Sequence, residues 1–315
     1  MPQSLTRRQT LAALTASAGV PFLPQTTPLS ALPTAPAASF IPCLNMSTIR
    51  GQKLGFVNEL ETAAKAGFRS VEIWIDTLQT YLKEGGTPAD ARKRIGDLGL
   101  TIENLIGFSP WIIDDDAARA KGLDQMKREM DLLAQLGCKR TAAPPVGAQT
   151  PDAPVIDLRK AAERYRAILE LSDQTGVVPQ LELWGFSKNL NKLSEVMYVA
   201  VESGHPSARL LLDIYHLHRG GSSPVSLPLV GKPAIDIFHV NDYPANVARE
   251  ALTDADRVFP GDGVAPIRET LRLIRRTDKP IVLSLEVFNK GYYAQDALTV
   301  AKTAFSKMQA MIKGV

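Results

Sequence analysis

The 315-residue sequence is poor in cysteine, and this scarcity excludes disulfide-rich and cysteine-zinc proteins. Cys43 and Cys138 are its only cysteines, and about 95 residues separate them. No CxxC spacing is present, so the sequence indicates neither a cysteine-based zinc site nor a redox pair. Export to an oxidising compartment would permit a disulfide. We instead expect both cysteines to be small buried apolar residues.

An excess of charge of one sign is also missing. The formal net charge is +3, and Arg7 and Arg8 supply two of these charges. Residues 1–38 contain no acidic residue, so the rest of the chain carries a net charge of about +1. A nearly neutral body offers no electrostatic surface for nucleic acid or for an anionic membrane. We therefore expect neither as a partner.

No apolar run is long enough to span a membrane, although the N-terminus is weakly apolar. Residues 11–23 follow the Arg7–Arg8 pair and precede a Pro/Ala-rich tract. Adjacent arginines before a short apolar segment are typical of a twin-arginine export signal. The alternative is a disordered tail with a chance arginine pair. We predict a signal peptide and linker over 1–38, cleavage near Ala38, and a periplasmic or secreted protein without membrane insertion of the mature chain.

The remaining residues, 39–315, form one predicted catalytic domain in which short apolar runs alternate with amphipathic helical patterns. Whether the protein forms a homo-oligomer stays open. The runs that predict strands are 41–48, 70–75, 100–108, 140–147, 177–185, 208–216, 234–242 and 280–288. The patterns that predict helices are 54–67, 88–99, 123–137, 157–176, 193–204, 264–277 and 294–313, with a short, poorly formed one at 223–231.

Eight strand–helix units within about 275 residues predict a parallel sheet with helical crossovers. This number and length match an α/β fold of the single (β/α)8 TIM-barrel type. The structural alternative is an open doubly wound sheet. Such a sheet usually carries a Gly-rich phosphate loop after its first strand. Here the corresponding turn, "NMSTIRGQKLG" at 45–55, lacks the GxGxxG pattern.

Four predicted strands in the second half end on polar residues at matched depth. Glu182, Asp213 and His239 each stand five residues after the start of their apolar run, and Glu286 stands six after its start. A barrel strand is buried on both faces, so it should be almost wholly apolar. Strands counted from the same end reach the same height, near the C-terminal rim where barrel enzymes keep their active sites. Taken singly, each residue could be a satisfied core or rim residue.

Three carboxylates and one imidazole at one level would be desolvated and would repel each other without a cation. A divalent metal at their centre removes both costs. Three oxygen ligands and one nitrogen ligand favour Mn²⁺, Mg²⁺ or Co²⁺ and leave Zn²⁺ open. The sequence therefore predicts one divalent metal ion held by Glu182, Asp213, His239 and Glu286.

The motifs around these residues resemble the xylose isomerase-like barrel superfamily, and more narrowly its sugar phosphate isomerase/epimerase family. The resemblance covers residues 40–315. It implies one divalent metal, often Mn²⁺, held by the same four residues. It also implies that His216 contacts a substrate oxygen and that Glu72 lines the pocket. The motifs are "LELWG", "LLLDIYHLH", "FHVND", "PGDGVAPI" and "LSLEVF".

The sequence departs from the ketose 3-epimerases of that family at two positions. Lys188 and Ala245 stand about where those enzymes have a further Glu and an Arg. Lys188 is therefore a candidate substrate-binding residue in place of that Glu. Arg249 and Arg257 could reach the substrate from the loop before "PGDG", although we expect both to be surface residues.

The expected chemistry is proton transfer next to a carbonyl that the metal polarises, through an enediolate. Glu182 and Glu286 are the candidate pair that removes and returns the proton, and His216 is the candidate shuttle. Trp74, Trp111 and Trp184 are placed to pack against a sugar face, and core packing is the alternative for each. Trp184 is also a candidate substrate-binding residue.

These residues predict a divalent-metal-dependent isomerase or epimerase of a sugar or sugar-like polyol, with a small carbohydrate as partner. A dehydratase or lyase of an inosose or 3-keto-glycoside would use the same proton abstraction and stays open. A secreted carbohydrate-binding protein that has lost catalysis is a further alternative. An abasic-site endonuclease shares the barrel, but its histidine-rich three-zinc cluster and basic face do not suit four histidines and a nearly neutral body.

Overall fold

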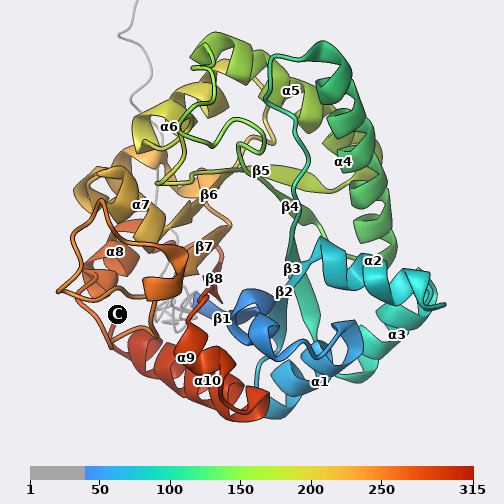
Figure 1. Ribbon diagram of the computed structural model, residues 1–315, viewed down its shortest axis with the longest axis vertical. Coiled ribbons are helices and arrows are strands. Elements are labelled where there is room, and N and C mark those ends of the chain that lie inside the picture. The colour runs from blue at the N-terminus through green and yellow to red at the C-terminus, as the bar shows by residue number, and fades with distance from the viewer. Residues whose placement is uncertain (1–39) are drawn as a thin grey trace, which may run out of the picture. The chain divides into compact units, whose positions relative to one another are not determined.

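A computed structural model describes residues 40–315, whose strands form one parallel sheet curved into a barrel (Figure 1). The predicted signal peptide and linker at 1–38 lie outside the described residues. Neighbouring strands pair in the cyclic order β3-β2-β1-β8-β7-β6-β5-β4. This order confirms the single (β/α)8 barrel rather than an open doubly wound sheet. The strands are β1 Phe40–Asn45, β2 Ser70–Trp74, β3 Thr101–Ile106, β4 Arg140–Ala143, β5 Val178–Glu182, β6 Leu210–Asp213, β7 Ile237–Val240 and β8 Ile281–Leu285.

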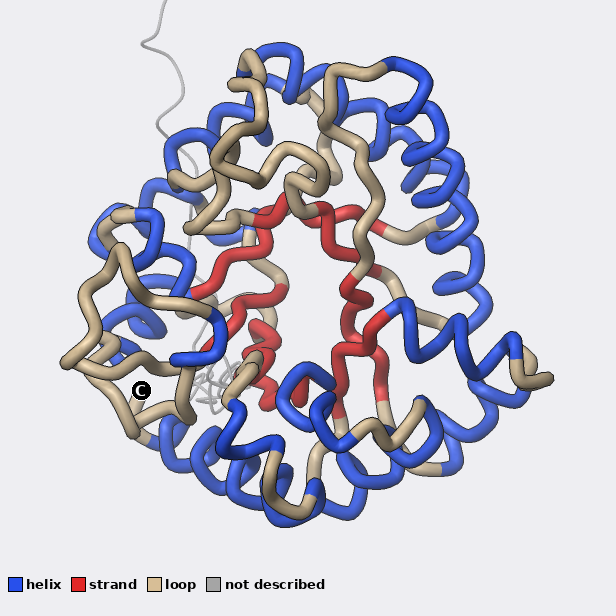
Figure 2. The backbone as a smooth tube through the Cα atoms, in the orientation of Figure 1, coloured by secondary structure: helices blue, strands red, loops and turns tan. Residues whose placement is uncertain are grey.

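The helices form a layer outside the ring of strands, as Figure 2 shows. The α-helices are α1 Phe56–Ala66, α2 Ile75–Lys83, α3 Pro88–Asp97, α4 Asp116–Leu136, α5 Leu158–Thr175, α6 Leu193–Glu202, α7 Ile214–Gly220, α8 Ile267–Ile274, α9 Lys290–Tyr293 and α10 Ala297–Lys313. Short 3-10 helices are η1 Met46–Gln52, η2 Pro224–Val230, η3 Lys232–Ala234 and η4 Asp254–Asp256. Within the described residues, no helix is both long and apolar enough to cross a membrane.

Strands β3 and β4 meet at a seam that side chains close. The Thr141 hydroxyl donates to the Leu105 carbonyl at 3.3 Å, and the Arg140 guanidinium donates to the Glu103 carbonyl at 3.3 Å. Every other pair of neighbouring strands is joined by a backbone ladder. The barrel is therefore nearly closed, with its least regular contact between β3 and β4.

Helix α5 illustrates how the sequence attaches a helix to the sheet. Asp157 caps its N-terminus by accepting a hydrogen bond from the Lys160 N–H, and Gly176 ends it with a φ of 71° that favours glycine. The buried Tyr165 hydroxyl donates toward the Pro179 and Arg209 carbonyls, each at 2.9 Å. Apolar burial and these polar contacts together hold α5 against β5 and the start of β6.

The segment after β6 differs from the prediction of one strand over 208–216. The strand ends at Asp213 because its carboxylate accepts hydrogen bonds from the Tyr215 and His216 N–H groups at 2.6 and 3.1 Å. That geometry is an N-cap, so α7 begins at Ile214. The helix predicted at 223–231 is the 3-10 helix η2, which contains Pro228.

Both cysteines are buried and free, in agreement with the sequence-based expectation. Cys43 lies on β1 and Cys138 lies just before β4. Burial raises the pKa of both thiols, and that of Cys138 reaches about 12. Buried neutral thiols of this kind pack as small apolar residues.

A groove of about 630 Å³ lies over the residues that follow β1 and β2, and it encloses a buried carboxylate. Glu59 of α1 lines this groove and is only 2% exposed. Burial raises the pKa of Glu59 to about 7, although the nearby Arg50 acts in the opposite direction. Arg50 itself pairs with Asp76 and lies over the Trp74 ring at 4.3 Å. Charging Glu59 in the folded protein is therefore unfavourable.

We expect Glu59→Gln to stabilise the protein at alkaline pH. The pKa of Glu59 is raised from 4.5 to about 7. The folded protein binds the proton of Glu59 more tightly than the unfolded chain does. The stabilising contribution of protonated Glu59 is therefore complete below pH 4.5 and is lost as the pH rises through 7. Between pH 5 and 8, Glu59→Gln should gain about 2.5 kcal/mol in unfolding free energy relative to wild type. Urea unfolding at the two pH values measures this gain, with the exposed Glu84→Gln as control. An equal effect of Glu59→Gln at both pH values would contradict the prediction.

Candidate active site

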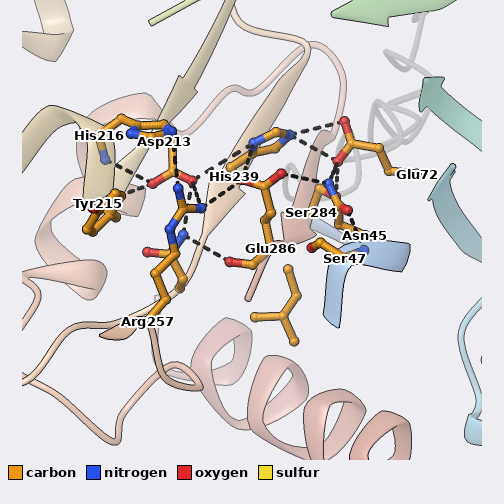
Figure 3. Close-up of polar contacts among 12 residues, drawn as sticks. Asn45, Ser47, Glu72, Asp213, Tyr215, His216, His239, Arg257, Ser284 and Glu286 are labelled. Carbon is orange, nitrogen blue, oxygen red and sulfur yellow. Dashed lines mark hydrogen bonds and ion pairs between the residues drawn. The ribbon is translucent and has the colours of Figure 1, made fainter. Parts of the chain in front are cut away.

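The carboxyl ends of β6, β7 and β8 bring three of the predicted metal ligands together. Asp213 stands beside His239 in the register of the sheet, and His239 stands beside Ser284. Glu286 lies two positions beyond Ser284, on the same face of its strand. Ligand atoms of Asp213, His239 and Glu286 all lie within 4.8 Å of one another, and all three residues are buried. Figure 3 shows the three side chains pointing toward one another.

The His239 ring presents one nitrogen to this carboxylate pair. Its Nδ1 atom lies 3.4 Å from Glu286 Oε2 and 3.9 Å from Asp213 Oδ2. Nδ1 makes no hydrogen bond to any of the described residues, although His239 is fully buried. A buried imidazole nitrogen with two carboxylates beside it is a site for a cation or a proton. Burial alone would lower the pKa of His239, but Glu72 and Glu286 raise it well above its usual value.

The opposite edge of the His239 ring is fixed by Glu72. The Nε2 atom lies 3.0 Å from the Glu72 carboxylate. Asn45 and Asn104 donate to the same carboxylate at 2.7 and 2.6 Å, and the Ser284 hydroxyl donates at 2.5 Å. Because Glu72 accepts from all of these donors, it also orients the ring with Nε2 protonated. With one proton fixed on Nε2, Nδ1 is the ring atom that takes up either a second proton or a metal ion between Asp213 and Glu286.

Arg257 inserts a buried guanidinium beside the carboxylate pair. Its Nη1 atom donates to Glu286 Oε2 at 2.7 Å and to Asp213 Oδ2 at 3.3 Å, and Arg257 is 1% exposed. Burial alone would raise the pKa of Glu286, but His239 and Arg257 hold it below its usual value. The burial of Arg257 corrects the expectation that it is a surface residue. Arg249 is exposed, as expected, and pairs with Glu250.

Glu182, the fourth predicted ligand, lies outside the close group of three and faces the cavity above it. Its Oε2 atom is buried and makes no hydrogen bond among the described residues. Burial raises the pKa of Glu182 to about 8, although the imidazole of His239 acts in the opposite direction. Glu182 and Glu286 therefore line one cavity with opposite shifts of their pKa values. Two carboxyl groups in such different environments suit different roles in proton transfer.

His216 is held neutral at the edge of the same cavity. Arg257 Nη2 lies 3.1 Å from His216 Nε2, and a guanidinium can only donate. The proton of the imidazole is therefore on Nδ1, which is buried and unpartnered among the described residues. Burial, and next the charge of Arg257, lower the pKa of His216 well below its usual value. His216 is thus a neutral side chain with one free N–H donor.

Aromatic rings line the rest of the cavity, which has a volume of about 180 Å³. Neighbouring ring centroids lie 5.9 Å apart between Phe288 and Trp74, 5.4 Å between Trp74 and Phe108, and 6.5 Å between Phe108 and Trp184. Phe186 continues the series at 5.4 Å from Trp184. Flat apolar walls around a polar floor suit a small ring whose oxygens face the floor and whose C–H faces meet the walls.

The comparisons with known proteins agree with this architecture. Residues 60–310 match a family model described as xylose isomerase-like TIM barrel. The chain belongs to this family. It is similar to an inosose isomerase of Bacillus velezensis, with 25% identity over 277 residues that cover 86% of this chain and 96% of that protein. It is also similar to a 3-dehydroshikimate dehydratase of Pseudomonas putida, with 27% identity over 75% of this chain and 36% of that longer protein.

A solved structure described as the IOLI protein with a binding zinc atom shares the fold of this xylose isomerase-like barrel. The two superpose with a TM-score of 0.79 and 23% sequence identity, over 87% of this chain and 98% of that one. The curated relatives of this chain thus include an inosose isomerase and a 3-dehydroshikimate dehydratase.

Two other predicted site residues of this xylose isomerase-like barrel lie away from the cavity lining. Lys188 is exposed and does not line the cavity. Glu72 lies under the floor, where it contacts His239 rather than the cavity. Trp184 and His216 line the cavity, where both are predicted to contact a substrate, whereas Trp111 is buried with its indole N–H donating to the Pro144 carbonyl.

Proposed function

We propose that the protein is a divalent-metal-dependent isomerase or epimerase of a keto-sugar or inosose. The observation that carries this proposal is the unpartnered Nδ1 of His239, directed at Asp213 and Glu286 beneath a cavity that Glu182 also lines. One neutral nitrogen and two or three carboxylates form a donor set that suits Mn²⁺, Co²⁺ or Zn²⁺. The zinc in the IOLI protein structure and the inosose isomerase relatives support the same assignment.

Asp213, His239 and Glu286 would hold the metal, with Glu182 as the fourth ligand. A metal bound there would supply Lewis-acid polarisation of the substrate carbonyl. In the ionised form that a bound cation favours, Glu182 has a free carboxylate oxygen and would remove the proton next to that carbonyl. Glu286 lines the same cavity and would return a proton, taken up from solvent, to the neighbouring carbon or to the opposite face.

His216 and Arg257 would orient the substrate. The free Nδ1–H of His216 would donate to a substrate hydroxyl, while Arg257 keeps the imidazole in that tautomer. The Arg257 guanidinium would also stabilise negative charge as it develops on a substrate oxygen. Trp74 and Trp184 would pack against the C–H faces of the ring and exclude water.

Dehydration is a second candidate, which the similarity to 3-dehydroshikimate dehydratase favours. The same proton abstraction leads to dehydration when the carbanion expels a hydroxyl at the next carbon. Lyase activity on a 3-keto-glycoside would follow the same course with an aglycone as leaving group. The three outcomes differ in their products, so one assay can distinguish them.

Metal analysis and solvent-deuterium exchange test the proposal. The purified protein should hold about one divalent ion per chain. The holoenzyme is then incubated in D₂O with ketoses, inososes, 3-dehydroshikimate and 3-keto-glycosides. Deuterium at the carbon next to the carbonyl in an isomerised product supports an isomerase or epimerase, whereas loss of water or of an aglycone supports a dehydratase or lyase. A metal-loaded protein that exchanges no substrate would overturn the enzyme assignment and favour a carbohydrate-binding protein.

A further inference from the structure

Asp242, the last residue of "FHVND", makes an unusual number of contacts to the loop that carries Arg257. Its Oδ2 atom accepts hydrogen bonds from the Gly261 and Gly263 N–H groups at 2.9 and 3.0 Å. Its Oδ1 atom accepts from the N–H groups of Ala265 and of the adjacent Tyr243 at 2.8 and 2.9 Å. The residue is only 1% exposed, so these bonds are shielded from water. Asp242 thus fastens the "PGDG" turn to the end of β7.

The backbone of Asp242 fixes the same loop a second time. Asp242 and Val258 exchange backbone hydrogen bonds in both directions, each at 2.9 Å, as an isolated antiparallel bridge. Val258 directly follows Arg257, so the bridge sets where the Arg257 side chain starts. The Arg257 carbonyl in turn accepts from Asn289 Nδ2 at 3.1 Å. None of these contacts involves a predicted metal ligand.

The loop has little freedom to adopt another path over Asp242. A side chain at Gly263 would collide with the Tyr243 carbonyl and with Asp242 Oδ1. Gly261 has a φ of +89°, which favours glycine. The Asp242 carboxylate of "FHVND" therefore fits into the "PGDG" turn, which explains why the two motifs occur together in this chain.

We propose that Asp242 is a positioning residue that acts through Arg257. Its carboxylate holds residues 257–265 so that the guanidinium stays on Asp213, Glu286 and His216. The kinetic part of this inference rests on the proposed function. We call the hydrogen bonds from the N–H groups of Gly261, Gly263 and Ala265 to the Asp242 carboxylate the clamp. Without the clamp, the loop leaves the barrel end. Arg257 then loses its place in the cavity and becomes accessible to solvent.

Asp242→Asn tests the clamp, because it replaces one acceptor oxygen with an NH₂ group that faces two N–H donors. We expect its kcat to fall about 100-fold, the cost of displacing a positioned group by about 1 Å. The kcat of Arg257→Ala should fall at least as far. The double variant Asp242→Asn/Arg257→Ala should be no slower than Arg257→Ala alone. Asp262→Asn is the matched control, because its exposed carboxylate lies in the same loop and pairs with Lys307 on α10. Losses that multiply in the double variant would overturn the proposal, since Asp242 would then act independently of Arg257.

A chemical readout tests the clamp without any substrate. Phenylglyoxal modification followed by peptide mass spectrometry should find Arg257 protected in wild type and in Asp262→Asn, but modified in Asp242→Asn. The exposed Arg249 provides an internal reference. Should Asp242→Asn fail to fold, Gly263→Ala displaces the same turn and should expose Arg257 in the same way. Arg257 that stays protected in the folded variant would overturn the clamp, whereas exposed Arg257 in a protein without activity would overturn only the proposed function.

Discussion

Replacing His239 with alanine is expected to abolish stoichiometric metal binding and to lower turnover by about 1,000-fold or more. His239 supplies the only nitrogen among the predicted ligands, and it stands between Asp213 and Glu286. Lewis-acid polarisation by a bound metal contributes several kcal/mol to such reactions, which corresponds to a rate factor of about 10³. Inductively coupled plasma mass spectrometry of dialysed protein and the deuterium-exchange assay measure the two effects.

A graded comparison separates loss of the metal from loss of the fold. Glu72→Gln keeps the His239 ring but removes the carboxylate that fixes its tautomer, so metal affinity should fall about 10- to 100-fold rather than disappear. Excess metal should restore activity to Glu72→Gln and not to His239→Ala. A His239→Ala protein that retains a full equivalent of metal would contradict the assignment of the site.

Glu182→Gln is expected to lower the rate of deuterium exchange about 1,000-fold while leaving the metal in place. Glu182 lies outside the close group formed by Asp213, His239 and Glu286, so those three ligands remain. Glutamine cannot accept a proton from carbon, and a positioned general base contributes about 10² to 10⁴ in rate. Substrate exchange in D₂O measures the loss, and metal content measures the integrity of the site.

A matched control for this substitution lies on β3. Glu103 is also a largely buried carboxylate of the barrel, but it pairs with Arg140 and accepts from the Ser70 hydroxyl, away from the cavity lining. Glu103→Gln should leave the exchange rate unchanged although it alters the same kind of group. If Glu182→Gln exchanged as fast as wild type, the proton would have to leave through another residue, and Glu286 would be the next candidate.

The sequence predicts the eight strands and the level at which the site lies, because both follow from simple periodicities. A polar residue that interrupts an apolar barrel strand is costly to bury, so its position marks the functional end of that strand. Counting along the strands therefore places Asp213, His239 and Glu286 together. The helix α7 is missed because Asp213 ends the strand as an N-cap, which looks like a continuing apolar run in the sequence.

Residues whose position depends on loops could not be found in this way. Arg257 reaches the site through a long excursion whose path is set by contacts to Asp242, and no periodicity reports such contacts. The sequence places Arg249 and Arg257 in the loop before the "PGDG" turn, but it does not show which of the two enters the site. The sequence places Glu72 at the correct strand end. The hydrogen-bond donors around its carboxylate hold it behind His239, and a sequence does not show which side of a ring a neighbour occupies.

The seam between β3 and β4 has a consequence for how the molecule resists disruption. Only side-chain bonds such as that of Thr141 to Leu105 reinforce this junction, so it is the mechanical weak line of the cylinder. In the cyclic order it lies opposite β8, β7 and β6, which carry Glu286, His239 and Asp213. An opening that starts at this seam would separate β3 from β4 first and would reach β6, β7 and β8 last. The strands that carry the predicted metal ligands would therefore be the last to separate.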